Sequence, residues 1–120
     1  LHQLMPLLAN LQDKGPKVAL VTDGRLSGAS GKVPAAIHLS PAADEGGLIG
    51  KICDGDLITL DAVSGSLELM MSAEELASRP YAVCTQADHQ SGLGREYFQL
   101  FRDHVSSADT GASILFGLKP

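Results

Sequence analysis

The chain has 120 residues, and residues 1–120 are expected to form a single domain. Its formal net charge of −5 argues against a nucleic-acid partner, and no apolar run reaches the roughly 18 residues of a membrane span. Cys53 and Cys84 stand far apart with no C-x-x-C motif, so we expect reduced thiols and a cytoplasmic protein. Two such cysteines do not by themselves hold a zinc ion or an iron–sulfur cluster, and no metal site is predicted in this chain.

The N-terminal third is predicted to hold a helix and two short strands. Leucines recur at helical spacing within residues 2–14, and Gly15-Pro16 ends that pattern. An apolar strand is expected at Lys17–Thr22 and a second one at Ala35–Ser40. A further short extended piece is expected at Leu48–Ile52.

The middle of the chain reads as a β-hairpin followed by a short helix. Leu57–Val63 and Ser66–Met71 flank Ser64-Gly65, which is typical of a two-residue hairpin turn, and one face of the hairpin is expected to be buried. Ser72 followed three residues later by Glu75 is a capping box, and it predicts a helix that extends to about Ser78.

The C-terminal third is predicted to hold a helix over residues 95–105, with aromatic side chains along one side for packing, and an edge strand at 112–116. Strands and helices do not alternate as they do in a doubly wound sheet. We therefore expect the α+β class, with a barrel-like or sandwiched mixed β-sheet flanked by helices.

The loop of residues 22–32 carries the strongest functional signal. It follows a strand and contains three glycines, which allow a close backbone approach to a ligand, together with cations and hydroxyls. Leu26 stands where the P-loop and the dinucleotide fingerprint each need glycine, so neither pattern applies. Residues 1–38 hold four cations against two acids, whereas the remainder holds five against twelve. This local positive field favours a small-anion site; a polar turn after a strand is the alternative.

Residues 22–38, which read TDGRLSGASGKVPAAIH, resemble a signature of the dihydroxy-acid and phosphogluconate dehydratases. Asp54-Gly55-Asp56 is similar to a second segment of that family. Gly94–Phe98 and Gly111–Ser113 look like the phosphogluconate branch rather than the dihydroxy-acid branch. The resemblance covers nearly the whole chain.

This resemblance implies the C-terminal domain of an enzyme several times longer, similar in fold to the swivelling β/β/α domain of aconitase-like enzymes. It implies an iron–sulfur cluster, of the 4Fe-4S type, and a divalent metal in the N-terminal part of the full enzyme, with none bound by this chain alone. Residues 1–16 would form a lead-in helix that packs on that N-terminal domain. A homodimer and a phosphorylated sugar acid are the other implied partners.

The implied reaction dehydrates 6-phospho-D-gluconate to 2-keto-3-deoxy-6-phosphogluconate, in the Entner–Doudoroff pathway. The resemblance makes Ser27 the base for the proton at C2, with the isolated chain inactive. The implied substrate-binding residues are Asp23, Gly24, Arg25, Gly28, Ser30, Lys32 and His38. A bidentate arginine suits a carboxylate and a lysine suits a phosphate, but the sequence does not decide which cation meets which group. Without the family, Ser27 reads as a turn former, the cations as solvated charges and His38 as structural.

One position departs from the family pattern. Family members commonly have a glutamate in a P-E-A segment after the histidine strand, and this chain has Ala42 there. Either the contribution of that glutamate is lost here, or Glu45 takes its place. Three other interpretations remain open: a dihydroxy-acid dehydratase of branched-chain amino-acid synthesis, a non-catalytic anion-binding module, and an interaction surface built from the two terminal helices.

Overall fold

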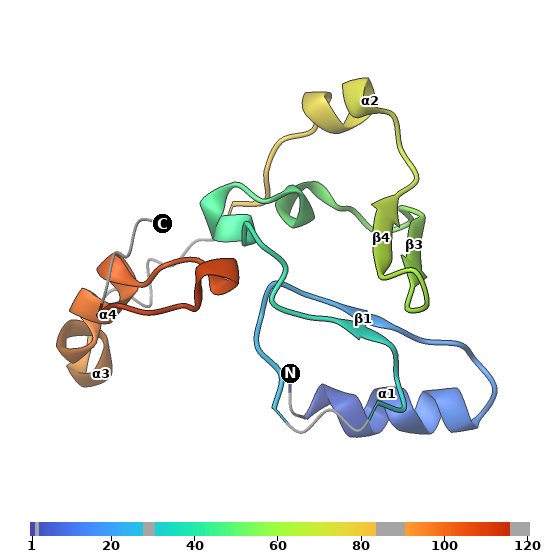
Figure 1. Ribbon diagram of the computed structural model, residues 1–120, viewed down its shortest axis with the longest axis horizontal. Coiled ribbons are helices and arrows are strands. Elements are labelled where there is room, and N and C mark those ends of the chain that lie inside the picture. Colours follow the sequence, from blue (N-terminus) through green and yellow to red (C-terminus); the bar gives the residue numbers. More distant parts are fainter. Residues whose placement is uncertain (2, 28–30, 84–90, 116–120) are drawn as a thin grey trace.

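The computed structural model describes residues 1, 3–27, 31–83 and 91–115. Helices and two small sheets alternate along the chain without merging into one layer (Figure 1). The helices and strands are α1 (Leu4–Asp13), β1 (Leu20–Val21), β2 (Ala35–Ala36), η1 (Ala43–Glu45), η2 (Leu48–Lys51), β3 (Ile58–Asp61), β4 (Ser66–Leu69), α2 (Ala73–Ser78), α3 (Leu93–Tyr97), α4 (Gln99–His104) and η4 (Ala108–Thr110).

The two predicted N-terminal strands are present but short. β1 and β2 pair in parallel, with Leu20 opposite Ala35. Backbone bonds from Thr22 N to Ala36 O and from Leu39 N to Thr22 O extend the contact beyond the strands. Leu20 and Val33 are the described apolar residues that are buried. This small core fixes both ends of the glycine-rich loop.

The predicted hairpin is confirmed, but the prediction of a two-residue turn is wrong. β3 and β4 pair antiparallel, and Asp61 lies opposite Ser66, so four residues form the turn. The Asp61 carboxylate explains the longer turn, because it accepts hydrogen bonds from the backbone N–H groups of Val63 and Ser64. The face expected to be buried is only partly covered in this chain: Leu60, Leu67 and Leu69 are half-buried, and Ile58 keeps 36% of its surface exposed.

The extended piece expected at Leu48–Ile52 is wrong, since residues 48–51 form the 3-10 helix η2. Pro41 O would lie 1.9 Å from a Cβ on Gly47, so only glycine fits at the start of this turn. The backbone N–H of Gly50 then donates to Gly47 O, and that of Ile52 donates to Ile49 O. Local bonds replace the strand pairing that an extended segment needs.

Ser72 caps α2 as the sequence predicts, because its Oγ accepts from Glu75 N at 3.1 Å. The single C-terminal helix predicted over residues 95–105 is instead two helices, α3 and α4, which meet at Phe98. The edge strand predicted over 112–116 is wrong for residues 112–115. Ala112 N and Ser106 N instead bond to Ser107 O and Ser113 O, which folds this tail back on itself.

The α+β class is confirmed, and the described strands form two separate two-stranded sheets rather than a closed barrel. α3 and α4 lie on one side of the molecule and the β3–β4 hairpin on the other (Figure 1). The radius of gyration is 16.8 Å and the accessible area 9328 Å². A compact chain of this mass has about 14 Å and about 6,200 Å². The chain therefore exposes much of the apolar surface that a complete domain buries.

Candidate functional site

The entry to the glycine-rich loop is fixed by backbone bonds. Thr22 Oγ1 accepts from Gly24 N at 3.0 Å, and the backbone N–H of His38 donates to Gly24 O at 3.2 Å. A Cβ on Gly24 would lie 3.0 Å from a methyl of Leu1 and 3.2 Å from Thr22 Oγ1. His38 has a φ of 55°, which suits its place at the bend after β2. Gly24 and His38 thus act here through their backbones, and the His38 side chain is exposed.

Asp23 anchors the loop to the next part of the chain. Its Oδ2 accepts from Ala43 N, the first residue of η1, at 2.8 Å. Glu45 is also engaged locally, because its Oε2 accepts from Ala42 N at 3.3 Å. Glu45 therefore closes the η1 turn, and among the described contacts it does not reach the glycine-rich loop.

The exit of the loop is tied to α1. Lys32 Nζ lies 2.6 Å from Asp13 Oδ2, and both side chains are about half exposed. The Gln12 side-chain amide donates to the Lys32 carbonyl oxygen, and the neighbouring Val33 is only 3% exposed. The Lys32 ammonium is therefore engaged by α1 in this structure.

Arg25 and Ser27 are the predicted site residues that stay available. Both are exposed, and neither makes a hydrogen bond or an ion pair with another described side chain. Gly28 and Ser30, the other predicted binding residues, lie outside the described residues. The structure thus separates the loop into anchored residues at its ends and available groups between them.

Arg25 also lines an open hollow of about 500 Å³, which the sequence did not reveal. Arg102 of α4 lines the same hollow, with Phe98, Phe101 and Ser113 among the other lining residues. These residues come from segments more than 70 positions away from Arg25 in the sequence. No local motif signals such a contact.

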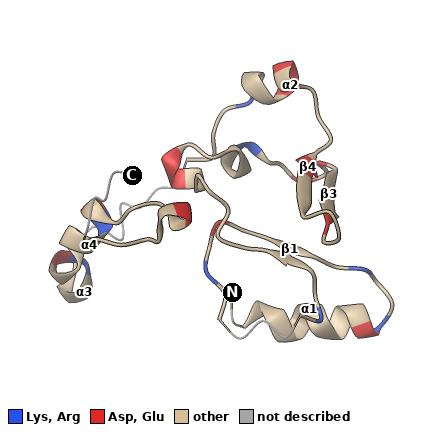
Figure 2. Ribbon diagram, viewed as in Figure 1, with Lys and Arg blue, Asp and Glu red and all other residues tan. Residues whose placement is uncertain are grey.

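Sequence reasoning also missed a charge cluster behind the Asp54-Gly55-Asp56 segment. Arg79 Nη1 and Nη2 lie 2.6 and 3.0 Å from the two oxygens of Asp56. Arg79 also pairs with Glu75 in the first turn of α2, whose acidic residues are red in Figure 2. Hydrogen bonds from Arg79, and secondly from Cys53 N, hold the pKa of Asp56 below its usual value and outweigh the desolvation that raises it. The same contact raises the pKa of Arg79. We call Asp56, Glu75 and Arg79 the carboxylate–arginine clamp.

Lys51 is buried beside this clamp without a carboxylate partner among the described residues. Its Nζ donates to Leu76 O at 3.0 Å and lies 4.6 Å from the centre of the Tyr81 ring. An ammonium at the C-terminal carbonyls of a helix is favourable, so Lys51 caps α2. These charges hold the fold together and are not available to a ligand.

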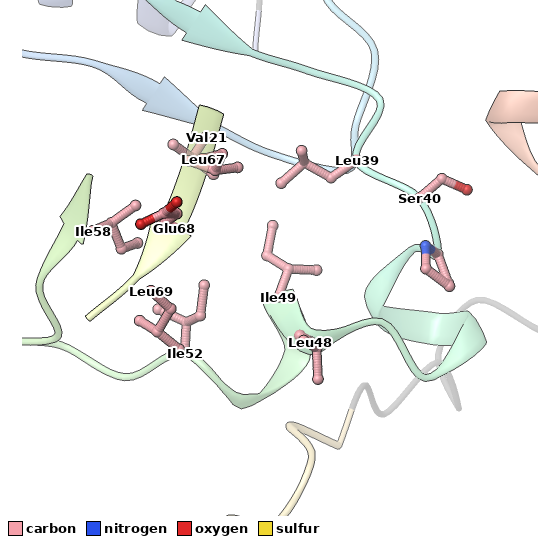
Figure 3. Close-up of a pocket in the computed structure, with 11 residues that line it drawn as sticks. Val21, Leu39, Ser40, Leu48, Ile49, Ile52, Ile58, Leu67, Glu68 and Leu69 are labelled. Carbon is pink, nitrogen blue, oxygen red and sulfur yellow. The ribbon is translucent and has the colours of Figure 1, made fainter. Parts of the chain in front are cut away.

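An apolar groove of about 320 Å³ opens between η2 and the hairpin (Figure 3). Side chains from η2, from β3 and β4 and from the strand ends of the first sheet face one another across it. Its main lining residues are Val21, Leu39, Ile49, Ile52, Leu67 and Leu69. Glu68 is the single charged residue among the described residues that line the groove, and the other lining residues are almost all apolar. The groove therefore suits packing rather than the binding of a charged ligand.

Metal binding and membrane insertion find no support among the residues described. No three His, Cys, Asp or Glu side chains cluster there in a way that would hold a metal ion. Within the same residues, no helix has the length and apolar character required to cross a membrane.

Comparison with known proteins decides the family. Residues 2–112 match the profile of the dihydroxy-acid/6-phosphogluconate dehydratase C-terminal family. The chain belongs to this family. A phosphogluconate dehydratase of Rhizobium meliloti is 49% identical over 116 residues, which is 97% of this chain and 19% of that protein. One from Pseudomonas aeruginosa is 51% identical over 112 residues, 93% of this chain and 18% of that protein.

The other branch of the dehydratase family is also similar. Dihydroxy-acid dehydratase 2 of Mesorhizobium japonicum is 45% identical over 102 residues, which is 84% of this chain and 17% of that protein. The chain spans about a fifth of the length of the curated relatives it matches. Its anchored loop is therefore one part of a much larger dehydratase architecture.

Proposed function

We propose that the full-length protein dehydrates 6-phospho-D-gluconate to 2-keto-3-deoxy-6-phosphogluconate, in the Entner–Doudoroff pathway. The identity to phosphogluconate dehydratases along nearly the whole chain, as in the 51% of the Pseudomonas aeruginosa protein, carries this proposal. The enzyme is a hydro-lyase, and this chain supplies the C-terminal part of it. On its own the chain is inactive, because the reaction needs groups that lie in the part of the enzyme outside this chain.

Ser27 acts as the base that removes the proton at C2. A serine hydroxyl is a weak base in water, so it needs a nearby cation or oriented N–H groups to favour the alkoxide. Arg25 lies two residues away, and both side chains are exposed. The bonds at Gly24 and Lys32 fix the two ends of the loop, which limits the conformations that Ser27 must lose on binding substrate.

Substrate binding falls to the cations and the small residues of the loop. Arg25 meets the anionic groups of the substrate, and Lys32 joins it when the exposed pair with Asp13 opens, which costs about 0–1 kcal/mol. The set is completed by Asp23 and Gly24 at the loop entry, by Gly28 and Ser30 within the loop and by His38. The Asp23 carboxylate contributes by holding the loop against η1.

An iron–sulfur cluster of the 4Fe-4S type and a divalent metal belong to the part of the enzyme outside this chain. The described residues do not fit as their holders, because no three ligating side chains cluster there and Cys53 stands alone among the described cysteines. The role of this chain is to bind the substrate and move its C2 proton.

The preceding part of the same enzyme covers the apolar groove and completes a swivelling β/β/α domain with a barrel-like sheet, of which residues 1–120 form a part. Relatives are about five times longer, and the excess accessible area leaves apolar surface to be covered. α1 belongs to this contact, since Leu4, Leu7 and Leu11 are 40–61% exposed. The assembled enzyme is a cytoplasmic homodimer.

The full-length enzyme assayed with two substrates tests this function. We expect its catalytic efficiency with 6-phosphogluconate to be at least about 100-fold higher than with a branched 2,3-dihydroxy acid. A substrate without a phosphate leaves the cations of the site without a partner, which lowers the efficiency by about 100-fold or more. The opposite preference would assign the dihydroxy-acid reaction instead. Turnover of neither substrate, with binding of 6-phosphogluconate retained, would assign a non-catalytic anion-binding module.

A further inference from the structure

The hollow beside Arg25 has the chemistry of an anion site. Arg25 reaches it from the glycine-rich loop, Arg102 from α4 and Ser113 from the C-terminal tail. We propose that this hollow binds the phosphate group of the substrate, with Arg102 as its principal ligand and Arg25 as the second. The proposal rests on the function proposed above and names a residue that the loop motif does not contain.

Neither guanidinium is neutralised by a carboxylate in the part of the chain that the structure describes. No carboxylate among the described residues pairs with Arg25 or Arg102, although other cations, such as Lys32 and Arg79, are paired. Among the described residues, the Arg102 guanidinium donates one hydrogen bond, from Nη2 to Arg95 O at 2.8 Å. That bond orients the planar fork and leaves its remaining donors for a phosphate, which arginine binds in a bidentate manner.

The apolar walls of the hollow strengthen the pairing between a bound anion and the two arginines. Phe98 and Phe101 line it with their rings 5.7 Å apart, and Val105 and Ile114 add apolar surface. Charge pairing is stronger beside apolar walls because the local dielectric constant is lower than that of water. Ser113 Oγ accepts from Leu115 N at 3.1 Å, so its own proton remains free for a phosphate oxygen.

The position of the hollow suits the far end of a sugar acid. Ser27 lies two residues from Arg25, a separation of at most about 7 Å along the chain. Four carbons and an ester oxygen separate C2 from phosphorus in 6-phosphogluconate, so Ser27 at C2 and Arg25 at the phosphate form a compatible pair. The tail is held near the site because Ser40 Oγ donates to Asp109 Oδ1 at 3.1 Å.

The segments that line the hollow also include those that resemble the phosphogluconate branch. Phe98 ends one of these segments, and Ser113 ends the other. A branched dihydroxy acid has no phosphate for this hollow. The position of these two segments beside the hollow thus gives a physical reason why they resemble the phosphogluconate branch rather than the dihydroxy-acid branch.

The test uses the full-length holoenzyme and its Arg102→Ala variant. We expect the KM for 6-phosphogluconate and the inhibition constant of inorganic phosphate to rise about 10- to 100-fold, because a charge-assisted bidentate contact is lost. The inhibition constant of gluconate, which lacks the phosphate, should stay within about twofold, and kcat should change little because the contact is equal in ground and transition states. The KM and the phosphate inhibition constant of Arg102→Lys should lie between those of the unmodified enzyme and those of Arg102→Ala, since lysine keeps the charge but not the planar guanidinium.

Lys17→Ala is the matched control, because Lys17 is an exposed cation outside the hollow. It should leave all three constants unchanged. Equal weakening of gluconate and phosphate in Arg102→Ala would place the substrate carboxylate or a fold defect at Arg102 and overturn the proposal, as would unchanged constants. Failure of the proposed function is distinct, because the unmodified enzyme would then not turn over 6-phosphogluconate at all.

Discussion

The glycine-rich loop and the carboxylate–arginine clamp use the same kinds of side chain in opposite ways. In the clamp, Arg79 is 21% exposed and forms a two-pronged bond to Asp56, whose side chain is 9% exposed. In the loop, Arg25 and Ser27 are exposed and have no described side chain as partner. The comparison separates charges that hold the fold from charges that are free to meet a ligand.

The backbone shows the same division at closer range. The loop is fixed at its two ends by bonds at Gly24 and Lys32, while Arg25 and Ser27 between them remain available. A site needs this combination, because reacting groups must be held in place without being consumed by internal contacts. In the clamp both oxygens of Asp56 and both terminal nitrogens of Arg79 are engaged internally, as expected for a structural element.

The largest effect is expected at Ser27. Ser27→Ala in the full-length enzyme should lower kcat about 10²- to 10⁴-fold, because it removes the proposed base, and should leave the substrate dissociation constant within about tenfold. Single-turnover kinetics and equilibrium binding measure the two quantities. Ser91→Ala, at another exposed serine, is the control and should have full activity. Retained turnover with lost binding would contradict the role of Ser27 as base.

Breaking the clamp should damage the fold rather than the chemistry. Arg79→Ala leaves the Asp56 carboxylate without its main partner in a largely buried place, so we expect a clear fall in the Tm of the full-length enzyme. Turnover per folded molecule should stay within about twofold, since no clamp residue meets the substrate. An unchanged Tm, measured by calorimetry, would show that the clamp carries no stability.

The clamp also predicts a dependence of stability on pH. The pKa of Asp56 is lower in the folded state than the usual value of about 3.9. Its contribution is therefore complete above about pH 4 and is lost as the pH falls through the lowered pKa. Denaturant titrations between pH 6 and pH 3 should show a steeper loss in the wild-type enzyme than in Asp56→Asn. Parallel curves would contradict the role of Asp56 in this loss.

The smallest effect is expected at Lys32. This residue belongs to the glycine-rich loop, but like the clamp residues it has an ion-pair partner. Its pair with Asp13 is about half exposed, so Lys32→Ala should cost about 0–1 kcal/mol of stability. The KM for 6-phosphogluconate should rise about fivefold at most, because the pair with Asp13 already competes for the ammonium. A rise as large as that expected for Arg102→Ala would move the principal phosphate contact to Lys32.

Local signals in the sequence predicted the local structure well. The leucine spacing gave α1, and Ser72 with Glu75 gave the start of α2, because helix periodicity and capping depend on residues three or four apart. The hairpin strands were also predicted, but the Asp61 carboxylate lengthened their turn. At Leu48–Lys51 a contact of Gly47 with Pro41 overrode the apolar pattern that favoured a strand.

The candidate site was predicted only in part, for the same reason. The glycine-rich loop is continuous in sequence and could be recognised there, including Ser27 and Arg25. The partners of Asp23, Lys32 and Arg79 depend on tertiary contacts with Ala43, Asp13 and Asp56. The hollow of Arg25 and Arg102 joins segments that no sequence spacing links.

Two arginine variants measured side by side test the division between structural and ligand-binding charges most directly. For Arg79→Ala and Arg102→Ala in the full-length enzyme, Tm and the KM for 6-phosphogluconate are determined on the same preparations. We expect a crossed result: Arg79→Ala lowers Tm with little change in KM, and Arg102→Ala raises KM about 10- to 100-fold with little change in Tm. A fall in Tm in both variants, or a rise in KM in both, would contradict this division of the charges.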